Sequence, residues 1–202
     1  SKTQAVVAGT FTQNKVAAAP VYVSKEVVAT GTAHAIVANA GCANACTGQQ
    51  GLDDAHKMAQ IAADELGVNA DDVIVGSTGV IGVNLPMDKL EAGIKDAVAN
   101  LSSDGSGNAG RAIITTDTHS KSVTCEFELS GKTVRMGAIA KGSGMIRPNM
   151  ATMLCYITTD IAIDQALLQK AVSGCVEKSF NMISVDGDMS TNDMVIVLAN
   201  GE

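Results

Sequence analysis

Aromatic residues are scarce in this sequence: its 202 residues include two tyrosines, three phenylalanines and no tryptophan. Basic residues are also in the minority, with 14 lysines and arginines against 21 acidic residues, which gives a formal net charge of −7 at pH 7. Proteins that bind nucleic acid rely on basic patches and on aromatic side chains that stack on bases. We therefore expect no nucleic-acid partner.

The sequence also lacks the features of a membrane or secreted protein. Apolar residues make up 46% of the chain, but most of them are alanine and valine scattered among glycine, which is not the pattern of a membrane span. No basic segment followed by an apolar one opens the sequence, so no signal peptide is visible. We expect no membrane partner and a cytoplasmic location.

Neither a disulfide framework nor a metal site is indicated. The five cysteines are an odd number, which fits a reducing compartment better than paired disulfides. Cys42 and Cys46 lack a second pair of ligands at zinc-finger spacing. Residues 186–190 begin like a calcium loop, but the glycine and glutamate required at its sixth and twelfth positions are absent. We expect no metal and no cofactor.

The order of apolar patterns predicts a mixed α/β (α+β) protein with layers of sheet and helix. Short runs rich in Val, Ile and Thr alternate with segments of helical period. Helices are predicted at 47–66, where Thr47 begins a possible capping box, at 86–101 and at 164–179. Strands are predicted at 5–12, 34–38, 73–76, 112–116, 123–129, 134–140, 153–158 and 194–198, with a hairpin turn at 130–132.

The chain is expected to form one folded unit. The Gly/Ser-rich stretch 102–108 is typical of a flexible connection, and no internal repeat is visible. The sequence begins and stops next to predicted strands, so we expect that further sequence precedes and follows it.

Candidate chemistry is sparse when residues are considered one by one. Three histidines do not form a recognisable catalytic arrangement with Ser and Asp. After the strand at 73–76, Ser77, Thr78 and Gly79 form a turn of small residues whose backbone N–H groups could bind an anion, although an ordinary turn explains them equally well. Lys141 and the glycines after it lack the spacing of a phosphate-binding loop.

Taken together, seven segments in order make the chain resemble the glutamate N-acetyltransferase (ornithine acetyltransferase) family. The resemblance extends over essentially all 202 residues, which makes it far more specific than any single motif. The segments are GTFTQN at 9–14, AAAPV at 17–21, ANACTGQQG at 43–51, STGVIG at 77–82, TTDT at 115–118, KGSGMI with PNMATML at 141–154, and DGDMSTND at 186–193.

The resemblance implies a precursor that cleaves itself between Ala151 and Thr152. Residues 1–151 would then be most of an α chain, and residues 152–202 the start of a β chain, within an N-terminal-nucleophile type of acyltransferase architecture. Thr152 would be the nucleophile, and its own α-amino group could serve as the general base. By the same resemblance, Thr78 and Gly79 would form the oxyanion hole, and Thr115, Lys141 and Thr152 would contact substrate.

The implied activity is transfer of the acetyl group of N-acetylornithine to glutamate in arginine biosynthesis, through an acetyl-threonine intermediate. The sequence leaves open whether acetyl-coenzyme A also serves as a donor, and a heterotetramer of two α and two β chains is the expected assembly. Two alternatives stay open. One is a self-cleaving amidohydrolase or aminopeptidase that uses the same nucleophile with water, and the other is a non-catalytic protein that binds a ligand or cation at the 186–190 loop.

Overall fold

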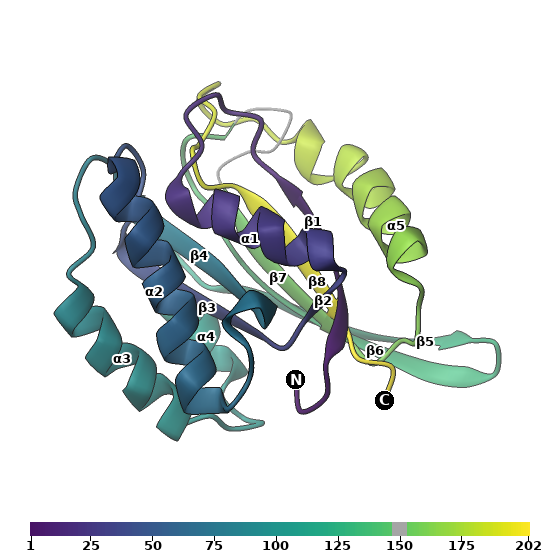
Figure 1. Ribbon diagram of the computed structural model, residues 1–202. Coiled ribbons are helices and arrows are strands. Elements are labelled where there is room, and N and C mark those ends of the chain that lie inside the picture. The colour runs from purple at the N-terminus through teal and green to yellow at the C-terminus, as the bar shows by residue number, and fades with distance from the viewer. Residues whose placement is uncertain (147–152) are drawn as a thin grey trace.

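The computed structural model describes residues 1–146 and 153–202, and its elements follow one another as mixed helices and strands (Figure 1). One sheet has six strands in the order β2-β1-β8-β7-β6-β5, and a second has the parallel pair β3-β4. The bounds are β1 Ala5–Phe11, α1 Ala19–Thr30, β2 Thr32–Ala33, β3 Ala35–Cys42, α2 Gly48–Leu66, β4 Val73–Val80, α3 Met87–Ala99, α4 Ser106–Ala112, β5 Lys121–Leu129, β6 Lys132–Lys141, β7 Leu154–Thr159, α5 Gln165–Glu177 and β8 Met194–Ala199, with short 3-10 turns at Ala70–Asp72 and Phe180–Met182.

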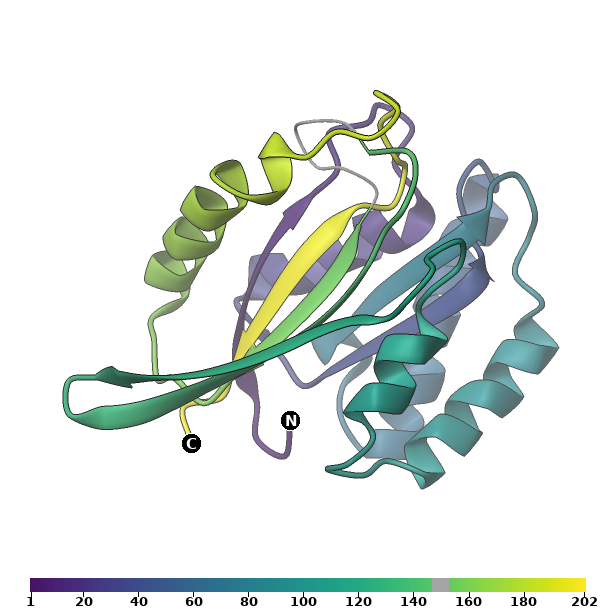
Figure 2. The same ribbon diagram turned by 180° about the vertical axis from the view of Figure 1, so that it is seen from behind.

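The elements form layers around the six-stranded sheet. Helix α5 covers one face, while α1 and the β3-β4 pair lie against the other face, with α2 and α3 outside them (Figures 1 and 2). Strand β8 shows why the sheet is buried on both faces. Its Met194, Ile196 and Leu198 pack toward α1, whereas Val195 and Val197 pack toward α5, as the alternation of side chains along a strand requires. None of the described helices is long and apolar enough to cross a membrane.

The segments before and after residues 147–152 are interleaved in one sheet. Strands β7 and β8 pair with each other in parallel, and they lie between β6 on one side and β1 on the other. Both edges of the inserted pair are therefore hydrogen-bonded to the earlier part of the chain. The layered α/β class predicted from the sequence is confirmed.

The three predicted helices are present as α2, α3 and α5. The sequence indicated the start of α5 correctly but predicted the wrong N-terminal cap for α2. Asp164 caps α5, since its carboxylate accepts hydrogen bonds from the N–H groups of Ala166 and Leu167. The capping box at Thr47 is wrong. The Thr47 hydroxyl donates instead to Asn44 Oδ1 at 2.8 Å, so it supports the turn before α2 and not the helix itself.

Two other sequence predictions are corrected. Helix α1 had no predicted counterpart, because this helix is valine-rich and packs between two sheets, so apolar residues are not confined to one face. The strand predicted at 112–116 is absent: α4 ends at Ala112, and no strand follows before β5. Part of the stretch predicted to be a flexible connection, from Ser106, belongs to α4.

The hairpin of β5 and β6 is confirmed and projects from the body of the molecule (Figures 1 and 2). Ser130 and Gly131 both have positive φ, at 52° and 76°, which is the conformation of a tight two-residue hairpin turn. Strand β6 runs from this tip back into the body of the molecule and ends at Lys141. Lys141 therefore lies at the candidate functional site.

A close contact between Gly76 and Tyr156 joins the small sheet to the large one, and it makes a testable prediction. A Cβ at Gly76 would lie 2.0 Å from the Tyr156 hydroxyl oxygen, which is buried without a hydrogen-bond partner in the described residues. We expect Gly76→Ala to lower the free energy of unfolding by ~1–3 kcal/mol through overpacking. Tyr156→Phe removes the obstructing oxygen and should recover part of that loss in the double variant.

Urea denaturation of the four proteins in this mutant cycle measures the coupling. Gly93→Ala is a matched control, because Gly93 lies within α3 with no atom near a new Cβ, and alanine there should stabilise by ~0.5–1 kcal/mol. Equal losses for Gly76→Ala with and without Tyr156→Phe would show that the contact does not limit packing.

Candidate functional site

The site begins at the carboxyl end of β4, where Thr78 and Gly79 follow the buried part of the strand. Thr78 is buried and Gly79 is exposed. Gly79 has φ of 133°, and a Cβ on it would lie 2.3 Å from the carbonyl carbon of Gly41 in the paired strand β3. Only glycine fits this backbone, so the chain passes from a buried strand to an exposed peptide within two residues.

Lys141, the last residue of β6, brings three sequence-predicted positions together. Its ammonium donates to Thr78 Oγ1 at 2.9 Å and to Thr115 Oγ1 at 3.0 Å, although these residues are 63 and 26 positions away in the sequence. Lys141 is only 4% exposed, and desolvation lowers the pKa of its ammonium. Because the ammonium occupies an acceptor site of Thr78 Oγ1, the Thr78 O–H stays available to donate elsewhere.

Asp117 holds the loop that carries Thr115. Its Oδ1 accepts the N–H of Gly142 at 2.7 Å and forms an ion pair with Lys121 at 2.5 Å. Burial alone would raise the pKa of Asp117, but the hydrogen bonds from Lys121 and Gly142 outweigh it and lower that pKa. The loop is therefore attached to the residue that directly follows Lys141, which keeps Thr115 beside the ammonium.

Asn192 ties the segment before β8 to the ends of β3 and β4. Its buried side-chain amide donates to the carbonyl oxygens of Ala43 at 2.6 Å and Ser77 at 2.9 Å. Ser77 directly precedes Thr78, so this amide fixes the backbone that presents the Thr78 hydroxyl. Asn192 lies in the segment DGDMSTND, 186–193, but nothing in the sequence indicated its role.

Asp193 is a second residue whose position the sequence did not reveal. It is 1% exposed, and its Oδ1 accepts the N–H of Met153 at 2.8 Å. Burial raises the pKa of its carboxyl group to about 7, although hydrogen bonds from the Met153 N–H and the Ser190 side chain, and the charge of Lys141, act in the opposite direction. The sequence pattern that could have pointed to Asp193 is the run of polar residues at 190–193, which stands directly before a strand of apolar residues only.

The loop considered as a calcium site is used for backbone contacts. Asp186 accepts the N–H groups of Met145 and Ile146, at 2.5 and 2.9 Å, and that of Asp188 at 3.2 Å. No cluster of three His, Cys, Asp or Glu residues suited to a metal occurs in the described parts of the chain.

Ala151 and Thr152 lie outside the described residues, so the structure places neither the predicted cleavage point nor the predicted nucleophile. What it does describe is the chain on both sides of them. Asp186 binds the chain at Ile146, and Asp193 binds it at Met153. The Met153–Asp193 contact lies on the side of the molecule where Lys141 and Thr78 meet, because Met153 and Asp193 directly precede β7 and β8 and Lys141 pairs with Leu154.

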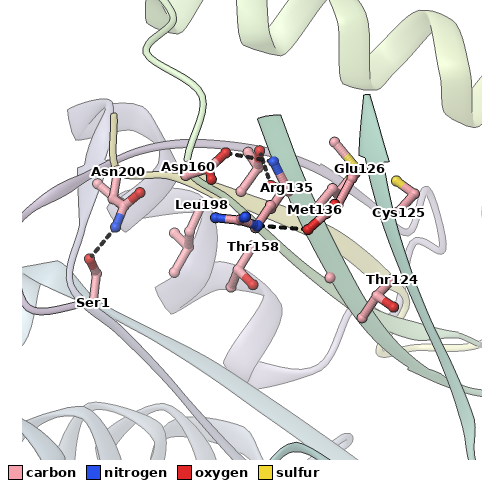
Figure 3. Close-up of a pocket in the computed structure, with 13 residues that line it drawn as sticks. Ser1, Thr124, Cys125, Glu126, Arg135, Met136, Thr158, Asp160, Leu198 and Asn200 are labelled. Carbon is pink, nitrogen blue, oxygen red and sulfur yellow. Dashed lines mark hydrogen bonds and ion pairs between the residues drawn. The ribbon is translucent and has the colours of Figure 1, made fainter. Parts of the chain in front are cut away.

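A surface hollow of about 630 Å³ lies elsewhere, at the other end of these strands (Figure 3). Thr159 and Leu198 line it from the carboxyl ends of β7 and β8, and an exposed ion pair of Arg135 with Glu126 at 2.7 Å crosses it. Of the predicted site residues that the structure describes, Thr78, Gly79, Thr115 and Lys141, none lines this hollow.

The fold and site define a layered α/β protein in which a buried lysine binds two threonine hydroxyls where several strands begin or end. A buried aspartate, Asp193, lies near enough for its charge to interact with that lysine. The model of the ArgJ family matches residues 1–202, and the chain belongs to this family.

Comparison with individual proteins agrees with this assignment. The chain is 54% identical over 201 residues to the arginine biosynthesis bifunctional protein ArgJ of Symbiobacterium thermophilum, and 52% identical over 206 residues to the glutamate N-acetyltransferase of Methanocaldococcus jannaschii. Both alignments cover the whole of this chain, but they cover only 50% and 51% of the lengths of the two relatives. The chain thus spans about half the length of these curated relatives.

A solved structure is similar as well. The ornithine acetyltransferase of Mycobacterium tuberculosis, complexed with ornithine, matches with a TM-score of 0.65 and 36% identity, over 74% of this chain and 78% of that one.

Proposed function

We propose that this chain is part of a glutamate N-acetyltransferase that moves the acetyl group of N-acetylornithine to glutamate in arginine biosynthesis. Membership of the ArgJ family supports this, together with the names of relatives that act as glutamate N-acetyltransferase or as ornithine acetyltransferase. The single observation that carries it is the Lys141 ammonium bound to both Thr78 and Thr115, since it assembles three residues of the expected site.

The expected chemistry has two stages. In the precursor, the Thr152 hydroxyl attacks the Ala151 carbonyl, the peptide C–N bond breaks, and water hydrolyses the resulting ester to leave Thr152 with a free α-amino group. In turnover, the Thr152 hydroxyl attacks the acetyl carbonyl of N-acetylornithine while the α-amino group accepts its proton. The ornithine amine leaves with a proton, and the amine of glutamate then takes the acetyl group from the Thr152 ester.

The described residues have parts to play in both stages. The Thr78 O–H and the backbone N–H of Gly79, an exposed residue, are the donors proposed to stabilise the oxyanion that forms when a carbonyl is attacked. An ammonium has three N–H bonds, of which Lys141 uses two on Thr78 and Thr115, so the third is available to the carboxylate of an amino-acid substrate. Strands β7 and β8 are hydrogen-bonded to β6 and β1 on their two sides, which supports the proposal that the two pieces stay together after cleavage.

Mass spectrometry of the full-length protein tests this proposal. We expect two pieces, the second beginning at Thr152, and we expect N-acetylornithine alone to add one acetyl group to that second piece as ornithine is released. Glutamate should then remove the added mass. A single uncut and active species, or transfer with no acetylated intermediate under rapid quench, would contradict the mechanism.

Acceptor dependence decides between the transferase and the related hydrolase. If water discharges the acetyl group as fast as glutamate does, an amidohydrolase is the correct assignment. Acetyl-coenzyme A is proposed as a second donor, and the same mass shift with it in place of N-acetylornithine would demonstrate that. The proposed heterotetramer of two α and two β chains is tested by native mass spectrometry.

A further inference from the structure

Ser77, the residue directly before Thr78, is held by two buried amide side chains. The Ser77 hydroxyl donates to Asn39 Oδ1 at 2.6 Å, across the pairing of β3 with β4. The Ser77 carbonyl oxygen accepts an N–H from Asn192 at 2.9 Å. Ser77 itself is completely buried. Its side chain and its main chain are therefore fixed by separate partners.

The same two amides also hold the end of β3. Asn39 donates to the Cys42 carbonyl oxygen at 2.9 Å, and Asn192 donates to that of Ala43 at 2.6 Å. A side-chain amide carries two N–H bonds, so Asn192 uses both of them on main-chain carbonyls. Each amide thus bridges Ser77, on β4, to a carbonyl at the end of β3 or just beyond it.

Asn192 is itself held in one orientation. Its Oδ1 accepts the Thr191 hydroxyl at 2.5 Å, which leaves its nitrogen facing the two carbonyls. Its main-chain N–H donates to Ser190 Oγ at 3.1 Å, and the Thr191 carbonyl accepts the N–H of Ala18 at 2.9 Å. Asn192 is buried, so a carbonyl that lost this amide would be left without a donor in a buried place, which is costly.

The position of Ser77 matters because the two proposed oxyanion donors, the Thr78 O–H and the Gly79 N–H, follow it directly. Donors of this kind are effective when they are already in place and need not move as charge develops. Lys141 orients the Thr78 hydroxyl, but that contact acts on the side chain alone. The main chain that carries both donors must be fixed by other groups, and a shift of about 1 Å can cost ~10²-fold in rate.

We propose that Asn192 is a positioning residue for acetyl transfer, whose amide fixes the Ser77 peptide against the end of β3 and so holds both oxyanion donors in place. The inference rests on the proposed function, which assigns those donors. Asn192 belongs to the second of the two proposed pieces and Ser77 to the first. The oxyanion donors therefore depend on contacts between the two pieces as well as on β4 itself.

The experiment is single-turnover acetylation of the processed full-length protein by N-acetylornithine, with and without Asn192→Asp. Aspartate keeps the size of asparagine and an oxygen for the Thr191 hydroxyl, but it cannot donate to two carbonyls. We expect the acetylation rate constant to fall by ~10–100-fold, less than or close to the loss of a whole donor. The substrate concentration at half-maximal rate should change by less than ~2-fold, because the hydrogen bonds of Asn192 go to the protein main chain.

Asn44→Asp is the matched control. Asn44 is completely buried, and its amide donates to the Gly51 carbonyl at 2.8 Å, in the turn before α2. The same chemical change there should lower stability and leave the rate constant near the wild-type value. The amplitude of acetylation counts the sites that are folded and active, so poor folding alone reduces the amplitude and keeps the rate constant. If Asn192→Asp yields no folded protein, Asn192→Ala is measured in the same way against Asn44→Ala.

Combination with Thr78→Ala tests the route by which Asn192 acts. The loss caused by Asn192→Asp should shrink in the Thr78→Ala background, because one of the two donors that it positions is already absent. The proposal is overturned if Asn192→Asp keeps the wild-type rate constant, if Asn44→Asp slows acetylation equally, or if the losses at Asn192 and Thr78 multiply in full. A wild-type protein that forms no acetylated intermediate would instead refute the proposed function.

Discussion

Replacing Thr78 with alanine should lower kcat for acetyl transfer by ~10²–10³, the scale for losing one donor to an oxyanion. The structure supplies the physical reason. Lys141 Nζ donates to Thr78 Oγ1 at 2.9 Å, which both orients the hydroxyl and directs its proton away from the lysine. A donor held in this way needs no reorganisation when charge develops on the attacked carbonyl oxygen, so its loss should appear mainly in kcat.

Replacing Lys141 should also change the steady-state constants for acetyl transfer. Lys141→Ala removes the group that orients Thr78 as well as the N–H proposed for a substrate carboxylate, so we expect kcat to fall and KM to rise together. The double variant with Thr78→Ala should lose less kcat than the two single losses multiplied, because the lysine acts on the oxyanion through Thr78.

Two further variants control this prediction. Thr78→Ser keeps the hydroxyl and should retain most of the activity. Thr116→Ala removes an exposed hydroxyl that hydrogen-bonds Ser143, on the same loop as Thr115, and should leave kcat near the wild-type value. Steady-state kinetics on the processed protein provides both constants. If Thr78→Ala turned over like the wild type, Thr78 would not belong to the reacting site.

The sequence was a good guide where structure follows from local pattern. β8 is a run of apolar residues bounded by polar ones, and the strand lies between two apolar layers as that pattern indicates. The Ser130-Gly131 turn was equally readable. Helix α1 was not, since a helix packed between two sheets loses the one-sided pattern by which an amphipathic helix is recognised.

The site itself could be named from the sequence only through family resemblance. Thr78, Thr115 and Lys141 belong to three separate segments, and no spacing along the chain reveals that one ammonium binds both hydroxyls. The roles of Asp193 and Asn192 could not be predicted from the sequence at all. Both side chains are buried, and their partners Met153, Ala43 and Ser77 come close to them only in the folded chain.

Gly79→Ala is expected to have at least as large an effect as Thr78→Ala, for a reason that concerns the backbone. A Cβ at this position would lie 2.3 Å and 2.4 Å from the carbonyl carbon and oxygen of Gly41, and 2.7 Å from the nitrogen of Cys42. These are main-chain atoms of the paired strand, which cannot turn aside as a flexible side chain would. The φ of 133° is in addition a conformation that residues with a side chain rarely adopt.

The end of β4 must therefore separate from β3 or change its φ to admit alanine. Either movement displaces the Gly79 N–H and the adjoining Thr78 hydroxyl, so both proposed oxyanion donors are lost together, and kcat should fall by at least ~10²–10³. The self-cleavage rate should fall with it, because attack on the Ala151 carbonyl develops the same kind of charge. Intact-mass analysis over time would then show the uncut precursor accumulating.

Gly82→Ala distinguishes this effect from the general cost of placing alanine at positive φ. Gly82 has φ of 80° and no atom near a new Cβ, and its N–H donates to the Ala45 carbonyl, a contact that alanine retains. This variant should lose ~1–2 kcal/mol of stability from backbone strain while keeping cleavage and most of kcat. If Gly82→Ala and Gly79→Ala impaired cleavage equally, strain alone would explain the loss, and the close approach of Gly79 to Gly41 would have no special part in holding the oxyanion donors in place.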